Sequence, residues 1–251
     1  MKKAAFYTLG CKVNQYETEA MTELFRNSGY EIVGFDEYAD VYIINTCTVT
    51  GLSARKSRHA IRKAKTLNKN SIIVVSGCYS QTAPDEVDAI PEVDVIIGTK
   101  NRGKIIELIN EKIKTGEKIN AVEDIMHDRE FENLGIDGYQ GRTRAYIKIQ
   151  DGCSQFCSYC IIPYARGPVR SRQKPDILEE VRKLADKGFK EVVLTGIHIA
   201  SYGKDLKGAT LIDLIKAVHE VEGIKRIRLG SIEPGLITDE FVKEASALEK
   251  L

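Results

Sequence analysis

Three cysteines stand close together in the second half of the chain. Cys153, Cys157 and Cys160 follow the spacing C-x3-C-x2-C, which differs from the paired C-x2-C of ordinary zinc sites. Cysteine thiolates normally bind all four irons of a [4Fe-4S] cluster, so three from one loop leave one iron open to another ligand. The spacing therefore predicts an iron–sulfur cluster with an open iron. A zinc loop, or three ordinary thiols, is the alternative.

The other three cysteines each follow a short apolar run. They occur as Leu-Gly-Cys11, Asn-Thr-Cys47 and Ser-Gly-Cys78, after AAFYTL, VYIIN and IIVVS. If these runs are strands of one parallel sheet, their carboxyl ends share an edge, where ligands bind. Gly10 and Gly77 would allow sharp turns or a close approach of the backbone. We expect a second cluster with three thiolate ligands; the alternative is that each cysteine is a small buried apolar residue.

The elements that would position these cysteines alternate between strands and helices. Helical spacing occupies residues 14–28, 53–67 and 101–114, between apolar runs that include VDVIIG. This alternation predicts an N-terminal α/β domain with a parallel sheet over residues 1–118. Residues 119–143 lose the periodicity and are rich in Gly, Asp, Asn and Arg, so we place a linker there.

From residue 144 the alternation resumes and predicts a second domain over 144–251. The runs AYIKI, EVVLTG and IKRIRLGSI alternate with expected helices near 176–187 and 211–221, and another helix begins near Thr238. These units are typical of a (β/α) barrel, but three strands cannot close one. We therefore expect an incomplete (β/α) barrel, with a small open sheet as the alternative.

Composition sets broad limits on function. Lys and Arg number 37 against 36 Asp and Glu, so the formal charge of +1 gives no general attraction to nucleic acid. The longest apolar stretches fall well short of the roughly 18 to 20 residues of a membrane span. We expect a cytoplasmic protein with reduced thiols, acting without a membrane or DNA partner.

Two sets of motifs resemble known families. Cys153, Cys157, Tyr159 and Cys160 match the C-x3-C-x-aromatic-C pattern of the radical S-adenosylmethionine (SAM) superfamily. The segments TLGCKVNQYETEAM, INTCTVT, SGCYSQ and RAYIKIQDGCSQFCSYCIIPYARGPVRSR resemble, in this order, the radical SAM methylthiotransferase family over nearly the whole chain. CKVNQYE, NTCTVTG and LTGIHIASYG are most similar to its branch acting on N6-threonylcarbamoyladenosine of tRNA.

The resemblance implies an enzyme that inserts a methylthio group at C2 of this adenosine, next to the anticodon. It implies two [4Fe-4S] clusters, held by the two cysteine trios, and two SAM molecules, one giving a methyl group and one the 5′-deoxyadenosyl radical. The tRNA anticodon stem-loop and an external one-electron reductant are the implied partners, whereas the sulfur donor is not indicated. The family continues into further barrel strands and an RNA-binding domain.

Candidate contacts to SAM lie at the ends of the expected barrel strands. The family has a glycine-containing motif where Thr195 and Gly196 stand, although its acidic third position is Ile197 here. Polar residues after the next strand could also reach the ligand, or could serve as helix caps. These candidates, with the aromatic residue of the cysteine motif, are Tyr159, Thr195, Gly196, Ser231 and Glu233. Among the histidines only His198, just past a strand end, is placed to line the site.

Basic residues suggest where RNA could bind. Between Val41 and Pro84 there is no acidic residue, and five basic residues at steps of three and four would form one helical stripe: Arg55, Arg58, Arg62, Lys65 and Lys69. A solvated helix face is the alternative. A second basic group is Arg166, Arg170, Arg172 and Lys174, of which Arg170 and Arg172 are our RNA candidates. Arginines of this group could instead bind the SAM carboxylate or a barrel acid.

Three other functions remain open from the sequence. Sister branches of the family modify isopentenyladenosine in tRNA or an aspartate of a ribosomal protein. A non-catalytic iron–sulfur redox sensor is the alternative from another class, because clusters with cysteine ligands also serve sensing.

Overall fold

The alternating pattern of the sequence forms two separate sheets. In the computed structural model, residues 1–49, 51–136, 138 and 143–251 are described. They divide into one unit of residues 1–128 with 156–167 and a second unit of residues 129–155 with 168–251. The first division falls inside the expected linker, of which residues 137 and 139–142 lie outside the described residues.

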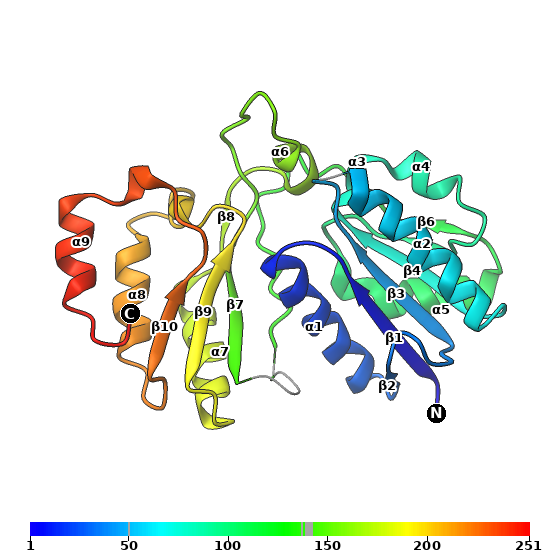
Figure 1. The fold of residues 1–251 in the computed structure, drawn as a ribbon, viewed down its shortest axis with the longest axis horizontal. Helices are drawn as coiled ribbons and strands as arrows, with labels where there is room; N and C mark the ends of the chain where they lie inside the picture. Colours follow the sequence, from blue (N-terminus) through cyan, green and yellow to red (C-terminus); the bar gives the residue numbers. More distant parts are fainter. Residues whose placement is uncertain (50, 137, 139–142) are drawn as a thin grey trace. The chain divides into compact units, whose positions relative to one another are not determined.

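The sheet of the first unit is parallel throughout. Its strands stand in the order β2-β1-β3-β4-β5-β6 (Figure 1). Their bounds are β1 Lys3–Thr8, β2 Glu31–Val33, β3 Val41–Thr46, β4 Ile72–Gly77, β5 Val95–Ile96 and β6 Ile119–Asn120. The long central strands β1, β3 and β4 are the apolar runs that precede the three N-terminal cysteines. The short β6 comes from residues that the sequence assigned to the linker.

Helices cover both faces of this sheet. On one face α1 (Lys12–Asn27) and α5 (Ile105–Thr115) pack on alternate strand residues, as Phe25 does with Ile43. On the other face α2 (Gly51–Leu67) buries Ile61 against Ile44. The shorter α3 (Cys78–Thr82), α4 (Pro84–Asp88), α6 (Ile162–Arg166) and 3-10 turn η1 (Arg102–Lys104) complete the unit. This arrangement confirms the predicted N-terminal α/β domain, because alternation along buried strands supplies both apolar faces.

The second unit has the strand order β10-β9-β7-β8. Strands β7 (Arg144–Asp151), β9 (Glu191–Gly196) and β10 (Arg226–Leu229) are parallel, and β8 (Arg170–Ser171) pairs antiparallel with the end of β7. Its helices are α7 (Lys174–Asp186), α8 (Leu211–His219) and α9 (Asp239–Ser246), with 3-10 turns η2 (Ile199–Ser201) and η3 (Pro234–Leu236). Helix α7 contacts β7, and α8 contacts β10 (Figure 1). Parallel strands each followed by a helix confirm the predicted partial barrel.

Thr210 and Thr238 explain where two of these helices begin. Their hydroxyls accept hydrogen bonds from the backbone of Asp213 (3.2 Å) and Phe241 (3.1 Å), which caps α8 and α9. Among the described residues, every helix is too short or too polar to cross a lipid bilayer.

Candidate functional site

The three N-terminal cysteines lie in turns after adjacent strands. The pairing registers align Thr8 of β1 with Asn45 of β3, and Thr46 of β3 with Gly77 of β4. Cys47 and Cys78 directly follow the last aligned pair, and Cys11 ends the turn after β1. Topology therefore brings residues far apart in sequence to one edge of the sheet, as the sequence predicted.

Hydrogen bonds from Asn14 hold the first two turns together. Its side-chain nitrogen donates to the carbonyl oxygens of Leu9 at 2.8 Å and Thr46 at 2.9 Å. Its side-chain oxygen accepts a bond from the Cys11 thiol at 3.6 Å. A Cβ atom added to Gly10 would lie 3.1 Å from the Cβ of Cys47, so the two turns are in close contact.

Gly77 allows the third turn to approach the second. Its φ of +104° lies in a region that side-chain-bearing residues rarely adopt. A Cβ atom here would lie 2.5 Å from the carbonyl oxygen of Thr46 and 2.6 Å from Oδ1 of Asn45. A glycine is therefore required just before Cys78, which begins α3.

The three thiols differ in exposure. Cys11 is exposed, whereas Cys47 and Cys78 are buried. Burial raises the pKa of the Cys78 thiol, and the charge and hydrogen bond of Arg166 oppose that rise. The soft sulfur donors and the close glycine suit an iron–sulfur cluster. Among the described residues, however, no three cysteine, histidine or acidic side chains lie close enough together to hold a metal ion as they stand.

The other cysteine motif spans both units. Cys153 follows β7 in the second unit, whereas Cys157 and Cys160 lie in the 156–167 segment of the first. The backbone N–H of Cys160 donates to the carbonyl of Cys157 at 2.9 Å, forming a turn between them. Tyr159 within this turn is 91% exposed, so its ring is accessible to a ligand.

The predicted SAM contacts of the second unit lie at the carboxyl ends of β9 and β10. Thr195 is buried in β9, and a Cβ atom on Gly196 would lie 2.9 Å from the carbonyl oxygen of Gln150 in β7. Gly196 therefore lets neighbouring strands approach closely. Ser231 and Glu233 follow β10 and are exposed.

His198 links this strand edge to the cysteine motif. Its Nε2 lies 2.8 Å from Oε2 of Glu233, and its Nδ1 lies 2.6 Å from the Ser201 hydroxyl. Gln155, between two cysteines of the motif, donates to the same Glu233 oxygen at 3.1 Å. The hydrogen bond from His198, and to a smaller extent the one from Gln155, lowers the pKa of the Glu233 carboxyl. Sequence reasoning placed His198 just past a strand end as a residue lining the site, but it did not indicate the pairing of His198 with Glu233.

Two basic residues proposed for RNA are internal ion-pair partners. Arg170 and Arg172 are buried. Arg170 lies 3.7 Å from Asp151, and Arg172 lies 2.6 Å from Glu180. Their geometry fits the alternative drawn from the sequence, in which these arginines bind acidic residues of the barrel.

The expected basic stripe runs along α2, except that Lys69 lies in the turn after the helix ends at Leu67, and its members are divided between solvent and internal contacts. Arg58 donates to the Tyr79 hydroxyl at 3.1 Å, and Lys65 pairs with Asp94 at the same distance. The other three members are exposed: Arg55, Arg62 and Lys69. Of the five stripe residues, these three therefore present a side chain mainly to solvent.

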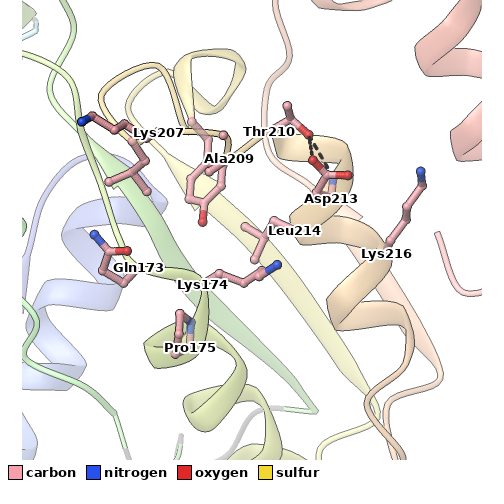
Figure 2. A pocket seen from close by; sticks show the side chains of 12 residues that line it. Gln173, Lys174, Pro175, Lys207, Ala209, Thr210, Asp213, Leu214 and Lys216 are labelled. Carbon is pink, nitrogen blue, oxygen red and sulfur yellow. Dashed lines mark hydrogen bonds between the residues drawn. The ribbon is translucent and has the colours of Figure 1, made fainter.

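A separate pocket of about 510 Å³ opens beside the beginnings of α7 and α8 (Figure 2). Lys174, Lys207 and Lys216 contribute to its lining, and Asp213 faces Thr210 through hydrogen bonds. Its lining, as far as the structure describes the chain, includes no cysteine and no predicted SAM contact. The pocket is therefore distinct from the candidate site.

Comparisons with known proteins place the chain in a family. Residues 3–98 match the uncharacterized protein family UPF0004, and residues 147–250 match the Radical SAM superfamily, which implies SAM and a [4Fe-4S] cluster. Threonylcarbamoyladenosine tRNA methylthiotransferase MtaB is 47% identical to this chain in Bacillus subtilis and 42% identical in Aquifex aeolicus. These alignments cover 100% and 99% of this chain, but 56% and 60% of the relatives. The chain thus spans a little over half of their length.

A more distant relative agrees with this assignment, and a solved structure agrees with the fold. The tRNA-2-methylthio-N(6)-dimethylallyladenosine synthase of Clostridium tetani is 34% identical over 100% of this chain and 57% of its own length. The structure of the radical SAM methyltransferase TsrM from Kitasatospora setae matches with a TM-score of 0.58 at 14% identity, covering 100% of this chain and 68% of that chain. That likeness supports the fold alone. The two matched regions, in this order and with these relatives, show that the chain belongs to the radical SAM methylthiotransferase family.

Proposed function

We propose that this chain is the catalytic part of a tRNA methylthiotransferase. The enzyme would insert a methylthio group at C2 of N6-threonylcarbamoyladenosine next to the anticodon, using two [4Fe-4S] clusters and two SAM molecules. The names of the most similar relatives support this substrate. The observation that carries the proposal is the arrangement of Cys11, Cys47 and Cys78 in adjoining turns, because a second cluster distinguishes sulfur insertion from simpler radical SAM chemistry.

The two cysteine trios have different roles in this proposal. Cys153, Cys157 and Cys160 would hold the cluster whose electron cleaves SAM to the 5′-deoxyadenosyl radical. Cys11, Cys47 and Cys78 would hold the cluster that carries sulfur. The exposed predicted contacts to SAM are Tyr159, Ser231 and Glu233, with Thr195 and Gly196 shaping the strand edge.

The proposed partners follow from the substrate. The exposed Arg55, Arg62 and Lys69 would contact phosphates of the tRNA anticodon stem-loop. A cytoplasmic one-electron reductant would supply electrons. The branch that acts on isopentenyladenosine of tRNA is the second candidate, because the dimethylallyladenosine synthase also aligns with the whole chain.

The test combines tRNA analysis with cysteine variants. Nucleosides from a deletion strain are measured by mass spectrometry after complementation with wild type, C78A, C157A or the control D36N, which alters an exposed ion pair with Lys63. Release of 5′-deoxyadenosine is measured separately, with the purified and anaerobically reconstituted proteins, SAM and a reductant. We expect C157A to abolish both 5′-deoxyadenosine release and 2-methylthio product. C78A should retain 5′-deoxyadenosine release but lose the product, and D36N should behave as wild type.

Four outcomes would contradict the proposal or part of it. Unchanged 2-methylthio-N6-threonylcarbamoyladenosine in the deletion strain would exclude this substrate, and loss of the dimethylallyl product would assign the other tRNA branch. About four irons per chain after anaerobic reconstitution, rather than about eight, would exclude the second cluster. A redox sensor would release no 5′-deoxyadenosine.

A further inference from the structure

A buried arginine joins the cysteine-bearing turns of the first unit. Arg166 ends α6 and is 0% exposed. Its Nε donates to Sγ of Cys78 at 3.2 Å, and its Nη2 donates to Oδ1 of Asn14 at 2.6 Å. The same Asn14 oxygen accepts the bond from Cys11. One guanidinium therefore contacts one predicted cluster ligand directly and a second through a shared amide.

The orientation of this guanidinium is fixed by other contacts. Glu17, which is 1% exposed, accepts bonds from Arg166 Nη1 at 2.5 Å and Nη2 at 3.0 Å. Arg102 also pairs with Glu17, at 3.1 Å. The Thr99 hydroxyl donates to the carbonyl of Ala165 at 2.7 Å and anchors α6 beside it. A two-pronged arginine–carboxylate pair is geometrically specific, so the two bonds from Arg166 to Glu17 determine where Nε points. Arg102 takes no part in the bonds that Arg166 makes to Cys78 and Asn14.

We propose that Arg166 is a positioning residue for the sulfur-carrying cluster, holding Cys78 in place and increasing the affinity of that cluster for an electron. This inference rests on the proposed function, because it requires a cluster at Cys11, Cys47 and Cys78. Outer partners orient metal ligands, and hydrogen bonds to ligand sulfurs tune the potentials of iron–sulfur clusters. A positive charge and an N–H donor both favour the more negative, reduced state.

Arginine suits this role better than other basic residues. Its guanidinium stays charged at any physiological pH, and its fork can bind Glu17 while Nε reaches the sulfur. Lysine would keep the charge as a single point without the fork. The role therefore depends on both charge and shape, and the two can be separated by substitution.

The position of Arg166 in the chain adds a second consequence. Cys157 and Cys160 belong to the same 156–167 segment, which is part of the first unit. The segment that supplies two thiols of the radical SAM motif also supplies the outer contact of the N-terminal trio. Because Arg166 contacts Cys78 directly, we expect a substitution of Arg166 to alter the surroundings of Cys78 before those of the radical SAM motif.

The experiment isolates the N-terminal cluster. The C153A/C157A/C160A protein is reconstituted anaerobically with iron and sulfide, and its iron content and midpoint potential are measured by EPR-monitored titration. R166Q, R166K and the control R102Q are made in this background, since R102Q removes an equally buried guanidinium from the same carboxylate. We expect R166Q to lower the equilibrium constant for one-electron reduction about tenfold, a shift of about 59 mV to more negative potential.

The remaining variants complete the test. R166K should shift the potential in the same direction by less, and R102Q should match the parent. Loss of iron from R166Q alone, with iron retained in R102Q, also supports the positioning role. In that case the midpoint potential of the cluster is compared between R166K and the parent, because R166Q would hold no cluster to measure. Equal potentials in the parent, R166Q and R166K would overturn the inference while leaving the second cluster in place. A parent protein that binds no iron would overturn both this inference and the proposed function.

Discussion

Replacing Gly77 by alanine tests the crowded turn before Cys78. With φ +104° and ψ −160°, Gly77 occupies a region that is essentially restricted to glycine and costs other residues about 1 to 3 kcal/mol. The new Cβ would also lie 2.5 Å from the carbonyl oxygen of Thr46. Such overpacking typically costs about 1 to 3 kcal/mol more. We expect G77A to lower the free energy of unfolding by about 2 to 6 kcal/mol in total.

The neighbours of Gly77 cannot easily relieve this clash. Thr46 is aligned with Gly77 in the β3–β4 pairing, and its carbonyl oxygen accepts the bond from Asn14. Moving that oxygen would disturb both the sheet edge and the contact that holds Cys11. G77A should therefore reduce the iron bound at the proposed N-terminal cluster as well as stability.

Gly116 provides the matched control. It also has a positive φ, +73°, but a Cβ atom there would meet nothing within 4 Å. G116A should therefore cost only about 1 kcal/mol, the conformational part of the penalty. Urea unfolding of the metal-free proteins, followed by circular dichroism, measures both variants. If G77A loses no more stability than G116A, the close approach described for this turn is incorrect.

Three further outcomes follow from the second unit. D151N should destabilise the protein by roughly 3 to 5 kcal/mol in urea unfolding, because Asp151 lies 2.6 Å from the buried ammonium of Lys148. In H198A, an NMR titration should show the lowered pKa of Glu233 rising toward its ordinary value, because the hydrogen bond from His198 is the largest cause of the shift. In the wild type, the stability that the Glu233 carboxylate gains from this bond is present near neutral pH and is lost as the pH falls through the lowered pKa. The buried Tyr202 hydroxyl, whose pKa is raised to about 12 by burial, donates a hydrogen bond to the Arg172 carbonyl at 3.1 Å, and Y202F should cost about 1 kcal/mol in thermal unfolding.

Each of these outcomes has a contrasting result. D36N, which alters an exposed pair, should cost under about 1 kcal/mol, so equal losses in D36N and D151N would contradict the importance of burial. An unchanged Glu233 pKa in H198A would show that His198 does not stabilise the carboxylate. Full stability of Y202F would mean that the bond to the Arg172 carbonyl contributes nothing.

The sheet and most helices were predictable because their burial is periodic along the chain. The predicted helix at 53–67 is observed as Gly51–Leu67, and the one at 176–187 as Lys174–Asp186. Strand β6 was missed because two residues are too few to show alternation. The edge position of the cysteine turns also followed from sequence, since parallel topology alone brings the ends of neighbouring strands together.

The contacts of the basic residues were not predictable in the same way. Arg166 reaches Glu17 across a separation of 149 residues, and no local pattern marks such a partner. One signal was present: Glu17 lies on the same face of α1 as the buried Val13 and Met21, and an acid on an apolar face requires a partner. The cation itself could not be chosen among the many arginines and lysines, because short basic runs look alike whether exposed or buried.

The strand order of the first sheet also constrains how the protein matures during synthesis. The turns that carry Cys11, Cys47 and Cys78 can meet only after β4 has left the ribosome, and the arginine that contacts Cys78 follows that cysteine by 88 residues. A nascent chain therefore exposes these thiols well before their surroundings are complete. For the proposed N-terminal cluster, delivery of iron and sulfide would best follow translation of α6, because thiols that are exposed earlier can be oxidised before the cluster forms.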